Sequence, residues 1–124
     1  MILERELSNK VLRCAYTVHS ELGPGLLEKT YEECLFYELK KVGLFVEKQK
    51  DQSLLYKDIL IDVGYKMDLL VENKIILELK SVESLTNVHT AQLLTYLKLS
   101  HCKIGYLINF NVVSLKEGIK RYVL

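Results

Sequence analysis

Several features that mark particular classes of protein are missing from this sequence of 124 residues. No apolar run approaches the roughly 18 residues of a membrane-spanning helix, and the first residues do not form a secretory signal peptide. Cys14, Cys34 and Cys102 are widely separated, form no CxxC pair and leave an odd thiol. This usage favours free cysteines in a reducing compartment. We therefore expect a cytoplasmic protein without membrane contact.

Charge and motif content exclude further classes. The formal net charge is +1, so a phosphate-binding surface would have to be local. The sequence has no glycine-rich loop of the kind that cradles phosphates. Ser81, Ser84 and Ser100 lack the His and Asp context of a nucleophilic serine. These absences leave metal-assisted chemistry and binding functions open.

The order of predicted elements indicates an α/β fold. No linker, low-complexity tract or repeat divides the chain, and 49% of its residues are hydrophobic, which predicts one domain over residues 1–124. The chain begins with helices, which are followed by a meander, a crossover helix and a further strand. This order predicts a mixed central β-sheet flanked by helices. The predicted helices cover residues 4–22, 26–42 (ended by Gly43) and 87–99 (capped by Asn87), and the extended segments cover 44–50, 54–57, 59–63, a hairpin within 65–80, 103–110 and 119–124.

The hairpin contains the most informative group of residues. A tight turn around Glu72 and Asn73 would join its two strands. A three-residue loop with Asn73 in the left-handed conformation would place Asp68 on the same face as Glu78. Lys80 lies on this face too, because side chains alternate along a strand. Two carboxylates and an ammonium group would then meet at one end of a sheet.

These residue types suit a magnesium site. Mg²⁺ prefers one or two carboxylates completed by waters and phosphate oxygens. A metal held by Asp68 and Glu78 would activate water, and Lys80 would orient that water and offset charge on the phosphate. The alternative is an amphipathic strand in which Glu78 and Lys80 form a solvated pair.

Glu28 and Tyr31 lie three residues apart on one side of the second predicted helix, directly after Gly23-Pro24-Gly25. On one interpretation, Glu28 is a further carboxylate facing the metal, with Tyr31 beside it. On the other, Glu28 is a first-turn glutamate favoured by the helix dipole, and Tyr31 belongs to the core.

A polar stripe on the third predicted helix offers a second supporting group. His89, Gln92 and Tyr96 follow each other at intervals of three and four residues. Gln92 would hold the lysine or a phosphate, while Tyr96 would stack on a base or fix a backbone contact. The alternative is an exposed helix face with Tyr96 half buried.

Ordered motifs along nearly the whole chain resemble the GxxExxY proteins of the PD-(D/E)XK nuclease superfamily. The naming motif corresponds to Gly25, Glu28 and Tyr31. Asp68 and the Glu78-Leu79-Lys80 segment correspond to the nuclease core, and Gln92 with Tyr96 resembles the Gln-x-x-x-Tyr element of RecB-like nucleases. The remaining similar segments are residues 18–24, 64–71 and 107–110.

The resemblance implies a restriction-endonuclease-like core in which Asp68 and Glu78 bind metal and Lys80 activates water. Glu28 would add a metal ligand and Gln92 would support catalysis. Tyr31, Lys66, His89 and Tyr96 would contact nucleic acid. The pattern departs from the family in three places, since Met67 replaces a proline, Lys66 an arginine and Asn111 a glycine.

We therefore predict a nuclease that uses Mg²⁺, or Mn²⁺ in its place, to hydrolyse phosphodiester bonds, in DNA rather than RNA. The alternative is a non-catalytic nucleic-acid-binding or accessory module that retains the nuclease fold. A chain of this size has no separate DNA-binding domain, which suggests a homodimer or a partner protein.

Overall fold

A five-stranded mixed sheet forms the centre of the computed structural model, which describes residues 4–62 and 64–124. Its strand order is β1-β4-β5-β6-β7, and only β5 and β6 run parallel. The described elements are α1 (Arg5–Leu22), α2 (Glu28–Lys41), β1 (Val46–Asp51), β2 (Leu54–Tyr56), β3 (Ile59–Ile61), β4 (Lys66–Val71), β5 (Ile75–Lys80), α3 (Asn87–Ser100), β6 (Ile104–Asn109), the 3₁₀ helix η1 (Leu115–Gly118) and β7 (Ile119–Val123). The predicted mixed α/β fold is confirmed.

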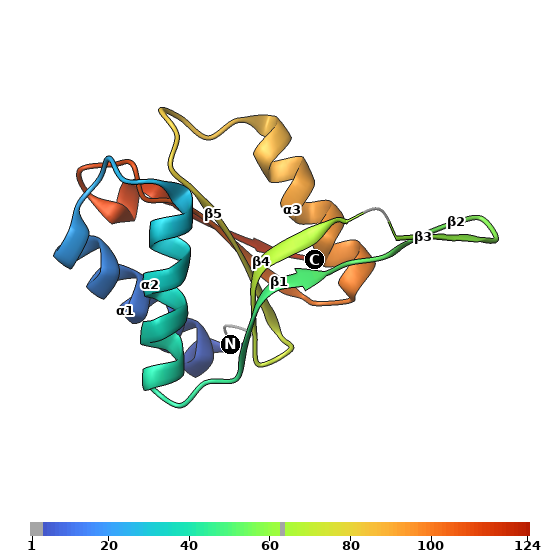
Figure 1. Cartoon of the computed structure of the whole chain (residues 1–124), viewed down its shortest axis with the longest axis horizontal. Coiled ribbons are helices and arrows are strands. Elements are labelled where there is room, and N and C mark those ends of the chain that lie inside the picture. The colour runs from blue at the N-terminus through green and yellow to red at the C-terminus, as the bar shows by residue number, and fades with distance from the viewer. Residues whose placement is uncertain (1–3, 63) are drawn as a thin grey trace.

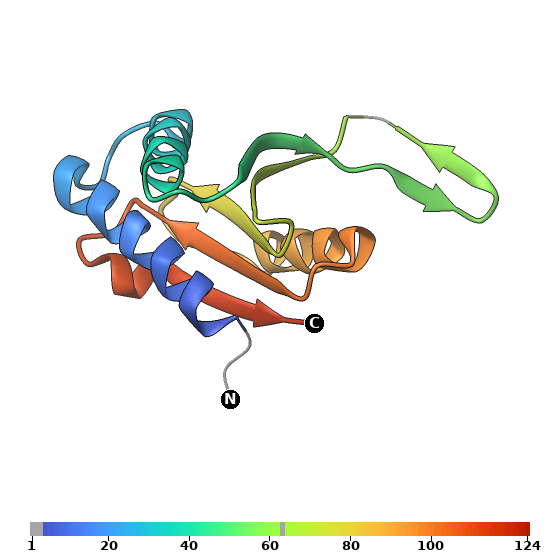
Figure 2. The same cartoon turned by 90° about the horizontal axis from the view of Figure 1, so that it is seen from below.

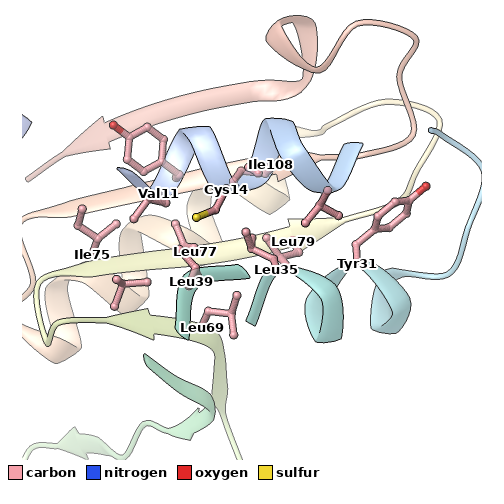
Figure 3. Packing of buried hydrophobic residues seen from close by; sticks show 14 of the residues in the cluster. Val11, Cys14, Tyr31, Leu35, Leu39, Leu69, Ile75, Leu77, Leu79 and Ile108 are labelled. Atoms are coloured by element: carbon pink, nitrogen blue, oxygen red, sulfur yellow. The ribbon is translucent and has the colours of Figure 1, made fainter. Parts of the chain in front are cut away.

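Helices α1 and α2 pack on one face of the sheet and on each other (Figure 1). Tyr31, Leu35 and Leu39 recur every four residues along α2 and are fully buried. Figure 3 shows such side chains between the helices and the sheet. Leu27 and Val42, predicted at the ends of this stripe, lie outside the helix and are exposed. Gly43, with φ +88°, follows the helix end as predicted.

Helix α3 covers the opposite face and provides the crossover between the parallel strands β5 and β6 (Figure 2). Its N-cap is Thr86 rather than the predicted Asn87. Thr86 accepts a hydrogen bond from the His89 backbone N–H at 3.4 Å, and His89 Nδ1 accepts one from the Thr86 N–H at 3.1 Å. This reciprocal capping box satisfies two N–H groups, which explains the one-residue shift. Within the described residues, no helix is long and apolar enough to cross a membrane.

Strands β2 and β3 form a separate two-stranded arm that projects from the body (Figures 1 and 2). The predicted meander is therefore wrong, because β1 pairs directly with β4 and the arm pairs only with itself. Cross-strand partners Leu55 and Leu60 are 66% and 68% exposed, so the arm contributes little to the core. Val63, the predicted last residue of that segment, lies outside the described residues.

Gly118 allows η1 to approach the end of β6 closely. A Cβ atom at this position would lie 2.2 Å from the backbone oxygen of Asn109, and backbone cannot yield as a side chain can. We expect Gly118→Ala to lower the free energy of unfolding by roughly 1–3 kcal/mol, as in other overpacked sites. Gly43→Ala is the control, because a Cβ there meets no atom within 4 Å and only strain at positive φ remains. Equal urea midpoints for the two variants would contradict this interpretation.

Candidate active site

The hairpin of β4 and β5 has the odd-numbered loop that the sequence predicts. Glu72, Asn73 and Lys74 connect the strands, and Asn73 is left-handed with φ +55°. Glu72 is also left-handed, and its carboxylate accepts a hydrogen bond from the Phe45 N–H at 2.5 Å. The ladder pairs Val71 with Ile75 and continues to the pair of Leu69 and Leu77. The next two residues in register are Asp68 and Glu78.

The regular backbone ladder ends at this point. Beyond it, the two carboxylates accept hydrogen bonds from backbone N–H groups of the opposite strand. Glu78 Oε2 accepts a hydrogen bond from the Asp68 backbone N–H at 3.0 Å. Asp68 Oδ2 accepts one from the Leu79 backbone N–H at 2.8 Å. Each carboxylate therefore has one oxygen fixed by the opposite strand. This reciprocal arrangement holds both acidic groups at the place where β4 and β5 separate.

The environment of the pair disfavours negative charge. Glu78 is only 4% exposed, and burial, followed by the charge of Asp68, raises its pKa to about 8. Burial also raises the pKa of Asp68 to about 6, with a further contribution from the charge of Glu32. Hydrogen bonds from backbone N–H groups and the charge of Lys80 on Glu78 offset only part of these effects. The site thus has a deficit of positive charge that a bound cation would relieve.

The raised pKa values predict how stability depends on pH. Between the ordinary glutamate pKa of 4.5 and a pKa of about 8 for Glu78, the folded protein binds more protons than the unfolded chain. The free energy of unfolding of the metal-free protein therefore falls as pH rises through this interval. Glu78→Gln removes this penalty, so the variant should exceed the wild type at pH 8 by on the order of 2 kcal/mol and by much less at pH 5. A pH-independent difference in urea unfolding would contradict a buried Glu78 that titrates with a raised pKa.

Lys80 ends β5, next to Asn109 of β6 in the parallel register. Its positive charge lowers the pKa of Glu78, so the ammonium acts on the same site. Asn109 is buried, its amide donates to Val82 O at 2.9 Å, and its side-chain oxygen accepts from the Val82 N–H at 3.1 Å. These bonds fix the chain directly after Lys80. Asn109 is a supporting residue that the sequence analysis did not single out.

Helix α2 adds a buried carboxylate to the site, that of Glu32, which the sequence analysis did not predict. This residue is 3% exposed, and its Oε1 accepts a hydrogen bond from Gln49 Nε2 at 2.5 Å. The same Gln49 nitrogen donates to Asp68 Oδ1 at 3.3 Å, which connects α2 to the hairpin. Glu28, one turn earlier, is exposed, but its charge raises the pKa of both Asp68 and Glu78. The i, i+4 spacing of Glu28 and Glu32 was the available signal.

Tyr31 belongs to the core, which is the second of the two interpretations of this residue. It is fully buried and stacks on Phe110 with ring centroids 4.5 Å apart. Its hydroxyl donates to Gly23 O at 2.6 Å and accepts from the Leu26 N–H at 3.1 Å. A residue so enclosed cannot contact nucleic acid directly in this conformation. Tyr31 instead fixes the loop that precedes Glu28.

Helix α3 brings Tyr96 towards the carboxylates from the other face. Tyr96 is 5% exposed rather than half buried, and its pKa is raised by burial and then by the charge of Glu78. The nearby amide of Gln92, which is exposed, lowers the same pKa. The side chains of Gln92 and Tyr96 therefore lie close to each other on α3. His89 has one ring nitrogen engaged in the cap of α3.

Lys66 begins β4, two residues before Asp68, and is exposed. Its ammonium pairs with the carboxylate of Asp51 on the neighbouring strand β1. This contact holds the pKa of Asp51 below its usual range. Because the ion pair is exposed, it is weak enough for a phosphate to compete with it.

The donor set at the site fits a hard divalent cation. Within residues 4–62 and 64–124, no three His, Cys, Asp or Glu side chains form a ready metal-binding cluster. The structure brings together two of the three predicted ligands, Asp68 and Glu78, whereas Glu28 does not join them in such a cluster. Two carboxylates suffice for Mg²⁺, because waters and substrate oxygens complete its octahedron.

Comparison with known families agrees with this geometry. The sequence model of the PD-(D/E)XK nuclease superfamily matches residues 5–122, nearly the whole chain. The chain belongs to this superfamily. Comparison with curated proteins and with solved structures gave no match.

The match extends over Asp68 and the segment Glu78-Leu79-Lys80, the residues that the sequence analysis predicts as the motif of the superfamily. Met67 replaces the proline and is 2% exposed in the smaller hydrophobic cluster under α3. The substitution therefore changes packing beside Asp68 and removes no acidic or basic group.

Proposed function

We propose that this protein is a Mg²⁺-dependent nuclease that hydrolyses phosphodiester bonds, with DNA as its substrate and Mn²⁺ able to replace Mg²⁺. The observation that carries the proposal is the pairing of the buried Glu78 with the partly buried Asp68. Both carboxylates have raised pKa values, and Lys80 lies on the same strand as Glu78. A protein that used this face only for packing would gain nothing from burying two acids that repel each other.

Asp68, Glu78 and Lys80 each have a distinct role in this proposal. Asp68 and Glu78 would hold the cation, while hydrogen bonds from the backbone and from Gln49 fix the orientation of their carboxylates. The cation supplies Lewis acidity and a bound water of lowered pKa. Lys80 orients the attacking water and stabilises the charge that develops on the phosphate oxygens.

The surrounding residues position the substrate and the ligands. Glu32 and Gln49 hold Asp68 in place from α2 and β1. Glu28 at the rim provides a further carboxylate for a water of the hydrated cation. Gln92 and Tyr96 face the substrate from α3. Lys66 and His89 contact the phosphates of the nucleic-acid strand where it leaves the site.

A cleavage assay tests the proposal. Single- and double-stranded DNA and RNA are incubated with the full chain in Mg²⁺, Mn²⁺ or chelator. We expect cleavage of DNA with either metal and none with chelator. Metal-dependent binding of DNA without cleavage under any condition would instead support the non-catalytic accessory module.

A further inference from the structure

The arm formed by β2 and β3 carries apolar side chains on both of its faces. Side chains alternate along each strand, and cross-strand partners share a face. The apolar residues of one face are Leu54, Tyr56, Ile59 and Ile61, and those of the other face are Leu55 and Leu60. An isolated two-stranded hairpin is marginally stable in water, and an exposed apolar patch of this kind indicates an interaction site. The arm therefore needs a partner that covers it.

The charge of the arm disfavours nucleic acid as this partner. Asp58 in its turn and Asp62 after β3 form no ion pair within the residues that the structure describes. Lys57 is the one basic residue of the segment 54–62, and its ammonium lies over the ring of Tyr56. The arm thus has a net negative charge, which repels phosphates. A partner surface that is both apolar and basic fits it instead.

A surface of this kind lies towards the end of α2. It is a shallow, mostly apolar hollow of about 560 Å³ lined by Glu33, Phe36, Tyr37, Lys40 and Lys41. The ammonium groups of the two lysines lie over the two aromatic rings. Neither ammonium pairs with a carboxylate of the described chain, whereas Glu33 is already paired with Lys48. The hollow therefore offers aromatic surface and two uncompensated positive charges.

The arm and the hollow lie along the same edge of the molecule. Strand β1 is the edge strand of the central sheet and contacts α2, and its Lys48 ammonium lies 4.7 Å from the ring centroid of Phe36. The arm follows β1 and extends away from α2 (Figures 1 and 2). It therefore points away from the hollow of its own chain. A two-fold axis at this edge places each arm over the hollow of the other copy.

We propose that a second copy of this chain covers the arm, in a two-fold symmetric dimer in which each arm docks into the hollow of its partner. The acidic groups of the arm then meet the two lysines, and its apolar side chains pack on the aromatic rings. Leu55, Tyr56, Ile59 and Leu60 are each more than half exposed. At roughly 100 Å² for each such side chain and an equal area on the hollow, two contacts bury on the order of 1,600 Å², the size of a standard interface. The dimer uses neither Asp68 nor Glu78 and stands independently of the proposed nuclease function.

Sedimentation of the full chain over a range of concentrations tests the dimer. We expect the wild type to associate with a Kd of about 10 µM. Leu60→Glu places a charge in the apolar contact and should weaken association at least about thirtyfold, the scale of a central interface residue. Its circular dichroism spectrum should not change, because the arm adds little to the core. Val113→Glu is the matched control, as Val113 is 94% exposed and lies between β6 and η1, away from the edge formed by β1, and it should associate as the wild type does.

Two chains with reversed charges test the reciprocal arrangement. One carries Lys40→Glu with Lys41→Glu, and the other carries Asp58→Lys with Asp62→Lys. Alone, each chain has an arm and a hollow of like charge, so its association should weaken at least about tenfold. In an equimolar mixture, each arm meets a hollow of opposite charge, and a heterodimer should form with about the wild-type affinity.

Three results would overturn the proposal. The first is a wild type that stays monomeric at about 200 µM, well above the expected Kd. Binding of that monomer to single-stranded DNA in chelator, or to phosphatidylcholine vesicles, and its loss in Leu60→Glu would then assign the arm to that partner. The second is an equal loss of association in Leu60→Glu and Val113→Glu. The third is a mixture of the two charge-reversed chains that forms no heterodimer.

Discussion

Replacing Lys80 by alanine should lower the rate of metal-dependent cleavage by roughly a hundredfold or more, the scale of one positioned catalytic group. The variant keeps both carboxylates and loses the positive charge that lowers the pKa of Glu78. Magnesium binding should therefore persist or tighten. Calorimetric titration of Mg²⁺ beside a cleavage assay measures the two effects separately.

Lys10→Ala is the matched control for this variant. Lys10 is exposed on α1, outside the β4–β5 hairpin and α3, and is not among the groups that shift the pKa of either carboxylate. Its cleavage rate should stay within about twofold of the wild type, as for a surface change remote from the chemistry. Cleavage by Lys80→Ala at the wild-type rate would exclude Lys80 from the mechanism.

Glu78→Gln should lower magnesium affinity and cleavage together. Glutamine keeps the size of the side chain and can still accept the Asp68 N–H hydrogen bond through its oxygen. It removes one of two negative ligands, and charge is what a hard cation requires. We expect magnesium affinity to fall at least about tenfold and cleavage about a hundredfold or more.

The exposed residue Glu117 of η1 provides the control, as Glu117→Gln makes the same chemical change away from the site. It should leave both quantities unchanged. If Glu78→Gln retained wild-type magnesium affinity, Asp68 and Glu78 would not share a cation, and the proposed site would be wrong.

The parts of the site that local rules determine were predictable from the sequence. Loop parity and strand alternation are short-range properties, and they were enough to place Asp68 opposite Glu78. The burial of Tyr31, Leu35 and Leu39 follows in the same way from helix periodicity.

The parts that depend on tertiary packing were missed. The sequence analysis did not single out Glu32, and only the position of α2 beside Gln49 and Asp68 makes it a buried partner of the site. The β2–β3 arm was read as part of a meander because its residues have ordinary strand propensity. Strand propensity does not specify which strands pair with one another. In the structure β1 pairs directly with β4, and this leaves the arm outside the main sheet. The capping of α3 by Thr86 depended on the side-chain geometry of His89.

The most direct test of the shared carboxylate site is NMR titration of the Asp68 and Glu78 carboxyl groups, with and without Mg²⁺. Without metal, we expect two linked titrations with pKa values raised to about 6 and about 8. With Mg²⁺, both should shift to lower pH, because the cation stabilises the ionised forms. Two independent carboxyl groups with ordinary pKa values that do not respond to Mg²⁺ would contradict the account.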